Sequence, residues 1–277
     1  MTFTPAVPAS GVLGLTLLDR SYDRQFEAFN QSPAIERAVA DFEARAGEIT
    51  TAEELVQDRG LLEVALGAFG LEDELPKRAL IRRVLEEGTL DQRSLANRLV
   101  DPAWRRFSET LALDTGGRLA IPSVRREIVD AFRERQFERA VGDQDVNLRL
   151  ALNFRREIAD IAAAPDVERS GWFRVIGSTP LRTVVFGALG LPDSFAAIDV
   201  DSQVARLNDR AAQVFGDASP AVFTDPDVVE DAVRRFLVRG EIEQGPTLNT
   251  PGGAALGLLQ GGLGPSALTG LLASRFS

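Results

Sequence analysis

The stretch LLEVALGAFGL, residues 61–71, returns further along the chain as LRTVVFGALGL, residues 181–191. The two strings share Leu, Val, Gly, Ala, Gly and Leu at the same relative positions. In both, apolar side chains recur every three or four residues and a glycine closes the run, a pattern typical of a buried helix ended by a glycine cap. The repetition predicts two related helical units within one chain.

The sequence around these strings predicts more helices of the same kind. Proline follows a capping side chain at Ser32, Asp101 and Thr179, as it does at helix starts, where its missing N–H costs nothing. No segment alternates apolar and polar residues as a half-buried strand does. We therefore expect an all-α bundle of nine to eleven helices, with a first helical unit at residues 20–115 packed as one body against a second unit at residues 116–242.

Both ends of the chain differ from this body. Residues 1–19 are almost uncharged, and residues 243–277 are rich in glycine and proline. We expect two flexible terminal segments, because such composition does not hold a stable fold alone. A second interpretation stays open for the C-terminal tail, since its eight leucines suit docking on a partner.

Composition excludes several chemistries. The 277 residues contain neither cysteine nor histidine, so a Ser-His-Asp triad, a thiol nucleophile and a Cys/His metal site are all impossible. Asp199 and Asp201 begin like a calcium loop, but the glycine and closing glutamate of that loop are missing. Helix caps and solvated faces account for these acids. We expect no metal, no cofactor and no enzymatic activity.

The overall charge argues against two further classes of partner. The net charge of −10 disfavours a nonspecific nucleic-acid binder, which needs a basic face. No uninterrupted apolar run reaches the roughly 20 residues of a membrane-spanning helix. The first residues also lack the basic start of a signal peptide. We expect no membrane insertion and no export by that route.

One region carries the opposite charge. Residues 80–111 resemble a helix-turn-helix whose second helix would present Trp104, Arg105 and Arg106, and residues 76–106 have a local net charge of +4. The turn position is taken by Val100, where a β-branched side chain tolerates positive φ poorly. DNA binding by a regulator is therefore the alternative function, with nucleic acid an unfavoured partner.

The same basic region suits a protein partner. Residues 191–242 carry a net charge of −5, so head-to-tail contact between molecules, or contact between the two units, would pair opposite charges. The basic face most suited to partner binding consists of four arginines: Arg93, Arg98, Arg105 and Arg106.

Several motifs occur in a characteristic order. They are GAFGL, SLANRLVDPAWRRF, GWFRVIGSTPLRTVVFGALGLP, DVDSQ and a closing RRFL. Over roughly residues 20–240 the chain resembles the alphaproteobacterial domain of unknown function 1217 family. The resemblance implies association with flagellar gene clusters and brings no catalytic residues. We accordingly expect a non-enzymatic structural or interaction protein of the flagellum, cytoplasmic or flagellum-associated, whose partners are flagellar components or further copies of itself.

Overall fold

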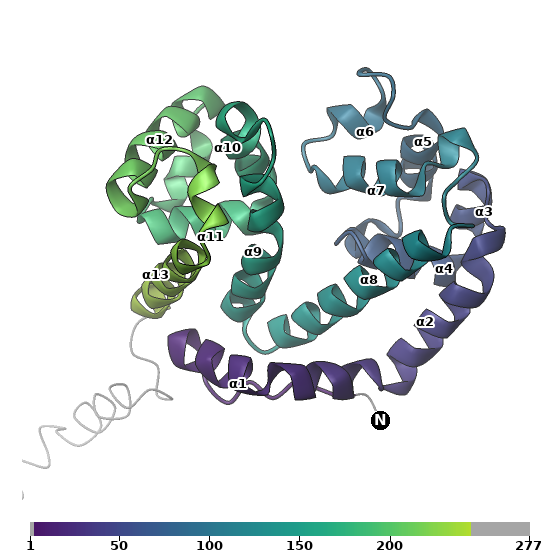
Figure 1. Ribbon diagram of the computed structural model, residues 1–277, viewed down its shortest axis with the longest axis horizontal. Coiled ribbons are helices and arrows are strands. Elements are labelled where there is room, and N and C mark those ends of the chain that lie inside the picture. Colours follow the sequence, from purple (N-terminus) through teal and green to yellow (C-terminus); the bar gives the residue numbers. More distant parts are fainter. Residues whose placement is uncertain (1–2, 245–277) are drawn as a thin grey trace, which may run out of the picture.

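The computed structural model describes residues 3–244, which fold into thirteen α-helices and five short 3-10 helices without a strand (Figure 1). The predicted all-α fold class is confirmed. The expected count of nine to eleven helices was too low, because α3 (Ala52–Gln57) and α6 (Leu95–Arg98) are too short to show a helical period.

The helices form two lobes on a common base (Figure 1). The base is α1 (Gly11–Asn30). The first lobe contains α2 (Pro33–Arg45), α3, α4 (Arg59–Gly67), α5 (Arg78–Glu87), α6, α7 (Ala103–Leu111) and α8 (Pro122–Gly142). The second lobe contains α9 (Val146–Ala162), α10 (Val167–Gly177), α11 (Thr179–Leu189), α12 (Val200–Phe215) and α13 (Pro226–Gln244). The 3-10 helices are η1 (Ala46–Glu48), η2 (Glu72–Glu74), η3 (Leu113–Thr115), η4 (Asp193–Ala197) and η5 (Pro220–Thr224).

The division between the lobes falls after α8. Helix α8 packs against α2 and α4 of the first lobe and also against α9 of the second, so the expected boundary between the two units at 115/116 stays a prediction. The chain turns sharply at residues 143–145, where α8 and α9 form a V (Figure 1). Helix α8 therefore ends at Gly142, and α9 is a separate helix.

Helix ends follow the sequence signals closely. Thr51 and Glu54 form a reciprocal capping box at the start of α3, in which each side chain accepts from the other residue's backbone N–H. Gly190 closes α11 and Gly216 closes α12, both with positive φ, the region that glycine enters without strain. Proline starts α2 and α13, as the sequence predicts.

The two repeated strings adopt the same local structure. Leu71 N–H donates to the carbonyl of Leu66 at 2.9 Å, and Leu191 N–H donates to that of Phe186 at the same distance. Over each string lies a phenylalanine ring from a later helix. A Cβ on Gly67 would lie 2.8 Å from Phe132 of α8, and a Cβ on Gly187 would lie 2.7 Å from Phe236 of α13. The likeness extends at least to these partner helices, and the wider kinship of the two units stays a prediction.

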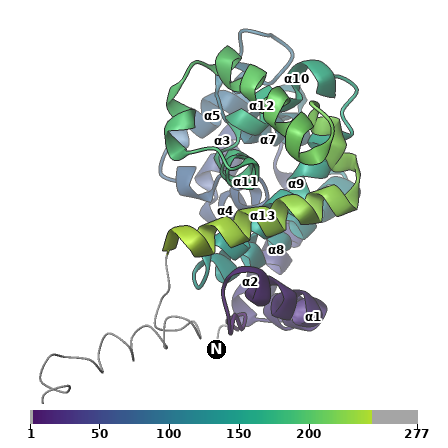
Figure 2. The same ribbon diagram turned by 90° about the vertical axis from the view of Figure 1, so that its left-hand side faces the viewer.

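Helix α1 corrects the expected flexible segment at 1–19. Residues 11–19 are the first half of this helix, with Leu15 and Leu18 buried. The near absence of charge, which suggested a tail, reflects close packing instead: a Cβ on Gly14 would lie 2.1 Å from the carbonyl oxygen of Ala9 and 3.3 Å from Leu148. Figure 2 shows α13 crossing above α1.

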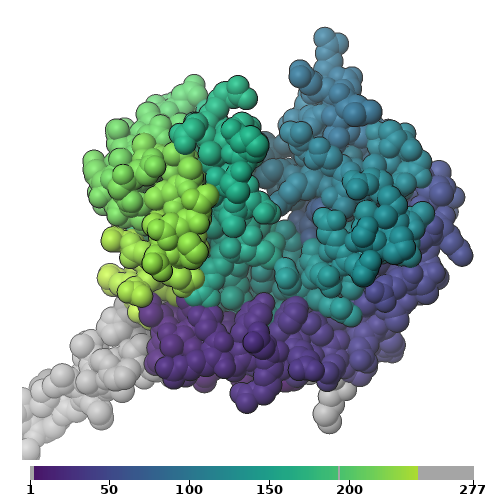
Figure 3. All heavy atoms as spheres, viewed as in Figure 1, coloured from purple at the N-terminus to yellow at the C-terminus, as the bar shows by residue number. Residues whose placement is uncertain are grey.

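Aromatic rings anchor the other half of α1. The centroids of the Tyr22, Phe26 and Phe29 rings each lie 5.2–5.6 Å from that of Phe137 in α8, edge to face. Since α1 contacts α2, α8, α9 and α13, it ties both lobes to one base (Figure 3).

Helix α13 continues through Gln244, and the remainder of the predicted Gly/Pro-rich tail, residues 245–277, lies outside the described residues.

Candidate functional site

The four arginines predicted to bind a partner all come from the connection between α5 and α8. Arg93 precedes α6, Arg98 is the last residue of that helix, and both are exposed. Arg105 is also exposed, with its nearest carboxylate, Glu109, 3.8 Å away. Arg106 turns toward the second lobe and lies 3.4 Å from Glu157 of α9. Three of the four arginines are therefore exposed, and the fourth, Arg106, forms an ion pair with Glu157 of the other lobe.

A groove separates the two lobes above their junction. Figure 3 shows the molecular surface hollowed between α5–α7 and α9–α10. The hollow has a volume of about 520 Å³, within the roughly 300–1,000 Å³ typical of ligand pockets. We call it the interlobe groove. From the first lobe it is lined by Thr89, Gln92, Ala96, Asn97, Leu99, Val100, Pro102 and Arg105, and from the second by Ser170, Phe173, Arg174 and Gly177.

Two large apolar side chains stand exposed in the walls of this groove, among polar ones. Val100 is 82% exposed and Phe173 is 45% exposed, and they stand on opposite lobes. The lobes touch at the floor, where a Cβ on Gly177 would lie 3.1 Å from the carbonyl oxygen of Val100. Large apolar side chains that remain exposed on both walls of one groove mark a surface suited to binding.

Below the groove, a cluster of charges is buried where α7, α8 and α9 meet. Glu157 accepts from Arg135 at 2.5 Å and from Arg156 at 3.2 Å, while Arg156 also donates to Glu138 at 2.8 Å. Arg106 completes the cluster from α7. Three arginines thus share two glutamates, and the excess positive charge favours the ionised carboxylates.

This excess charge decides the titration of the cluster. Burial raises the pKa of Glu157, but the charges of Arg135, Arg106 and Arg156 outweigh it and lower the pKa to about 2. Burial and the neighbouring charge of Arg156 lower the pKa of Arg135. A carboxylate held ionised in this way binds its neighbours tightly and is a poor proton donor or acceptor near neutral pH.

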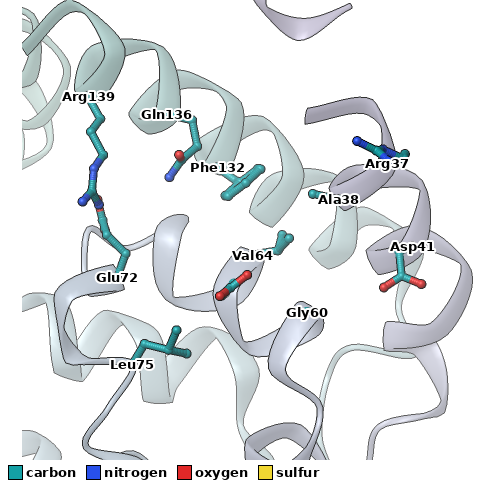
Figure 4. A pocket seen from close by; sticks show the side chains of 11 residues that line it. Arg37, Ala38, Asp41, Gly60, Val64, Glu72, Leu75, Phe132, Gln136 and Arg139 are labelled. Carbon is teal, nitrogen blue, oxygen red and sulfur yellow. The ribbon is translucent and has the colours of Figure 1, made fainter. Parts of the chain in front are cut away.

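A larger hollow lies elsewhere, between α2, α4 and α8 (Figure 4). It has a volume of about 790 Å³, and its polar side chains are mostly paired within the protein. Arg139 donates to Glu72 at 2.9 Å, and Arg37 donates to the carbonyl of Pro33 at 2.8 Å. Phe132 and Val64 form part of its apolar wall (Figure 4). Its walls therefore combine apolar side chains with charged groups that already have partners within the protein.

Asp199, which begins like a calcium loop in the sequence, and Asp101 both have structural roles at helix starts. Asp199 caps α12 by accepting from Ser202 N–H at 2.9 Å, the use expected for it. Asp101 accepts from Ala103 N–H at 2.8 Å at the start of α7. Within residues 3–244, no group of three or more Asp or Glu side chains is placed to hold a metal ion, and no helix is long and apolar enough to cross a membrane.

In the structure, the segment interpreted as a helix-turn-helix differs from that motif in its first helix and in the position of Trp104. Its first helix would be α6, which has only four residues. Trp104, expected on the recognition helix, is 5% exposed and packs against Phe107, so it anchors the core. Trp172 is likewise buried, and its indole N–H donates to the carbonyl of Ala218 at 2.9 Å.

Sequence reasoning missed Phe173 and Glu157. Phe173 lies next to the buried Trp172 and faces another lobe, a relation without a local signal. Glu157 does have one: it stands between Phe154 and Ile158 on the buried stripe of α9, where a charge needs an internal partner.

Comparison with known proteins agrees with this fold. The crystal structure of protein AGR_C_984 from Agrobacterium tumefaciens is similar, with a TM-score of 0.71 and 22% sequence identity, covering 87% of this chain and all of that one. No curated protein matches the chain. Residues 68–229, more than half of the sequence, match the family described as "Protein of unknown function (DUF1217)", which confirms the resemblance seen in the motifs. The chain belongs to the DUF1217 family.

Proposed function

We propose that this protein works without catalysing a reaction, as an interaction protein of flagellar assembly or structure, and that the interlobe groove is where it holds its partner. The observation that carries the proposal is the pair of exposed apolar side chains, Val100 and Phe173, on opposing walls of one groove. The flagellar setting rests on the association that the motif resemblance implies.

The charged groups support a role in binding over one in catalysis. The buried carboxylates Glu138 and Glu157 are engaged by Arg135 and Arg156, an arrangement that stabilises helix packing. Burial, chiefly, with the charge of Glu138, raises the pKa of the Tyr22 phenol to about 12. At neutral pH Glu157 and Tyr22 each keep one protonation state, whereas acid-base catalysis uses groups that titrate near the working pH.

Complementation of a deletion strain tests the proposal. We expect deletion of the gene to impair motility and the wild-type gene to restore it. A Val100→Asp/Phe173→Asp variant should be produced in folded form and fail to restore motility, because both side chains are exposed and only the groove changes. Val200→Asp is the matched control, since Val200 is 44% exposed on α12, away from the groove, and should restore motility fully. Normal motility of the deletion strain would remove the flagellar proposal.

DNA binding by residues 80–111 is the second candidate, favoured by one observation. Arg93 and Arg98 are exposed, and neither forms an ion pair with a described side chain. The test is retention of duplex DNA by the wild type and by an Arg93→Ala/Arg98→Ala/Arg105→Ala variant at low salt. Retention that depends on these arginines would favour the regulator.

A further inference from the structure

One wall of the interlobe groove is formed by a long connecting segment of the first lobe, residues 88–121. Helices α8 and α13 occupy the same place relative to the two repeated strings, with Phe132 and Phe236 over the matching glycines. The second lobe reaches α13 from α12 through residues 216–225, whereas the first lobe reaches α8 from α5 through residues 88–121. This longer connection contains α6 and α7 and supplies every residue of the first lobe that lines the groove.

The same connecting segment carries the most exposed large apolar side chains of the described residues. Leu90 is 84% exposed and Val100 is 82% exposed. Leu90 follows Thr89, which lines the groove, and Val100 lines the groove itself. Water-exposed side chains of this size add nothing to the stability of the fold, because their apolar area is not buried. Burial against an occupant of the groove would remove that area from water.

The charged side chains that line the groove are basic, and each has an acidic neighbour: Glu109 lies 3.8 Å from Arg105, and Asp166 lies 2.7 Å from Arg174. Although the chain has a net charge of −10, both charged residues that line the groove are arginines, Arg105 and Arg174. Arg93 and Arg98 lie on the other side of α6, where they line a neighbouring hollow. Asp166 holds Arg174 through Nη2 alone, at 2.7 Å, so the remaining guanidinium N–H groups are available to a ligand.

The exposed apolar side chains and the two arginines that line the groove together define the chemistry of a complementary ligand. We infer that the interlobe groove binds a segment of a partner protein in which apolar side chains stand beside carboxylates. The apolar side chains contact Val100 and Phe173, and the carboxylates pair with Arg105 and Arg174. The inference rests on the proposed function and adds the chemistry of the partner to it.

The charge of the groove distinguishes this partner from three other possible occupants: residues 245–277 of the chain, a nucleic acid and a second copy of the protein. Residues 245–277 of the chain itself are apolar, but their single charged side chain is Arg275, which the arginines of the groove repel. A nucleic acid would bring phosphates without apolar anchors and would leave Val100 and Phe173 exposed. The acidic helices of a second copy would bring carboxylates, and the experiment below distinguishes this case.

Selection from a library of random peptides, displayed against the full-length protein, tests the inference. We expect the enriched peptides to combine Leu, Ile or Phe with Asp or Glu. A fluorescein-labelled peptide of the consensus sequence then serves as the probe in anisotropy titrations. Val100→Asp/Phe173→Asp should weaken its binding at least about tenfold, as loss of central anchors does. Arg105→Glu should also weaken it, and added salt should weaken binding to the wild type.

Val200→Asp is again the control and should bind the probe as the wild type does. Circular dichroism of each variant establishes that it is folded, and Val100→Ser/Phe173→Ser provides a milder change should the double aspartate variant unfold. Enrichment of basic peptides, or binding that the groove variants leave unchanged, would overturn the inference. So would displacement of the probe by a synthetic peptide of residues 245–277, or self-association in ultracentrifugation that the groove variants abolish.

The two proposals fail in different ways. If Val100→Asp/Phe173→Asp abolishes motility but the selection yields no acidic peptides, the groove is a partner site of another chemistry and only the further inference falls. If acidic peptides bind the groove but the deletion strain swims normally, the further inference stands and the flagellar proposal falls.

Discussion

Gly67 lies where no other residue fits. It ends α4 directly beneath the ring of Phe132, and a Cβ added there would come within 2.8 Å of Cδ2. Gly67 and Phe132 are both buried, so a Cβ at residue 67 would force the ring out of its packed position. Gly60, on the same helix, has 3.4 Å to its nearest neighbour, which is an ordinary contact. One helix therefore contains a glycine required by packing and another that is not.

Gly67→Ala should lower the free energy of unfolding by about 1–3 kcal/mol, the usual effect of overpacking a core. Gly60→Ala, the control, should raise it by about 0.5–1 kcal/mol, because alanine favours the helix. Urea denaturation measures both. Equal stability of the two variants would contradict the packing at Phe132.

Tyr22 offers a spectroscopic test, since it is the only tyrosine in the chain. Burial, with the charge of Glu138, raises its pKa from 10.0 to about 12. Because the folded-state pKa lies above the unfolded value, this group's contribution to stability is complete below pH 10 and is lost as the pH rises toward 12. The absorbance of tyrosinate should titrate near pH 12 in the native protein and near pH 10 in urea. A native midpoint near 10 would place Tyr22 in solvent.

At the scale of the helix, α9 buries apolar side chains and a charged side chain on the same face. Leu148, Ala151 and Ile158 bury an apolar stripe, and Glu157 is buried beside them. Its burial is tolerated because α8 supplies Arg135 and α7 supplies Arg106. A buried ion is strongly destabilising once its partners are removed, so α9 depends on both neighbouring helices.

Replacement of that carboxylate tests this dependence. Glu157→Gln should destabilise the protein by about 3 kcal/mol at pH 7, because three arginines then share a single glutamate. The pKa of Glu157 is lowered from 4.5 to about 2, so its contribution is complete above pH 4.5 and declines as the pH falls toward 2. The difference between variant and wild type in urea denaturation should therefore shrink between those values. Asp160→Asn, an exposed acid on the same helix, is the control, and a difference that did not change with pH would refute the assignment.

At the scale of the whole molecule, two lobes stand on α1 and meet chiefly where α8 packs against α9. Arg106 reaches Glu157 across the junction, and Gly177 approaches the backbone of Val100 above it. The interlobe groove lies between these contacts and solvent. Its width follows from how the lobes are held, so a residue at the junction influences the groove without lining it.

Arg106→Ala should lower the free energy of unfolding by about 1 kcal/mol, a modest figure because its side chain remains 40% exposed. Arg105→Ala, the neighbouring residue with a 3.8 Å pair, should change stability by less than about 0.5 kcal/mol. A double-mutant cycle of Arg106→Ala with Glu157→Gln should give a coupling energy different from zero. Additive effects would show that the ion pair across the junction contributes nothing.

Local signals were sufficient for the parts of the molecule that depend on nearby residues. Helix type, the capping box at Thr51 and the positive φ at Gly70 and Gly190 all follow from residues within one turn of each other. The α1 helix was missed for a related reason. Its first half lacks charge because it packs on Leu148, and an uncharged run bears no mark of what will cover it.

The amino-acid sequence by itself determined an all-helical chain, its glycine-capped repeated strings and its family, because helix formation and capping are short-range interactions. Only the tertiary structure decided that Arg106 serves the junction while Arg105 faces the groove, and that Val100 stands opposite Phe173. Those relations join residues far apart in the chain, and their geometry is fixed by how helices pack around a shared core, which no local pattern encodes.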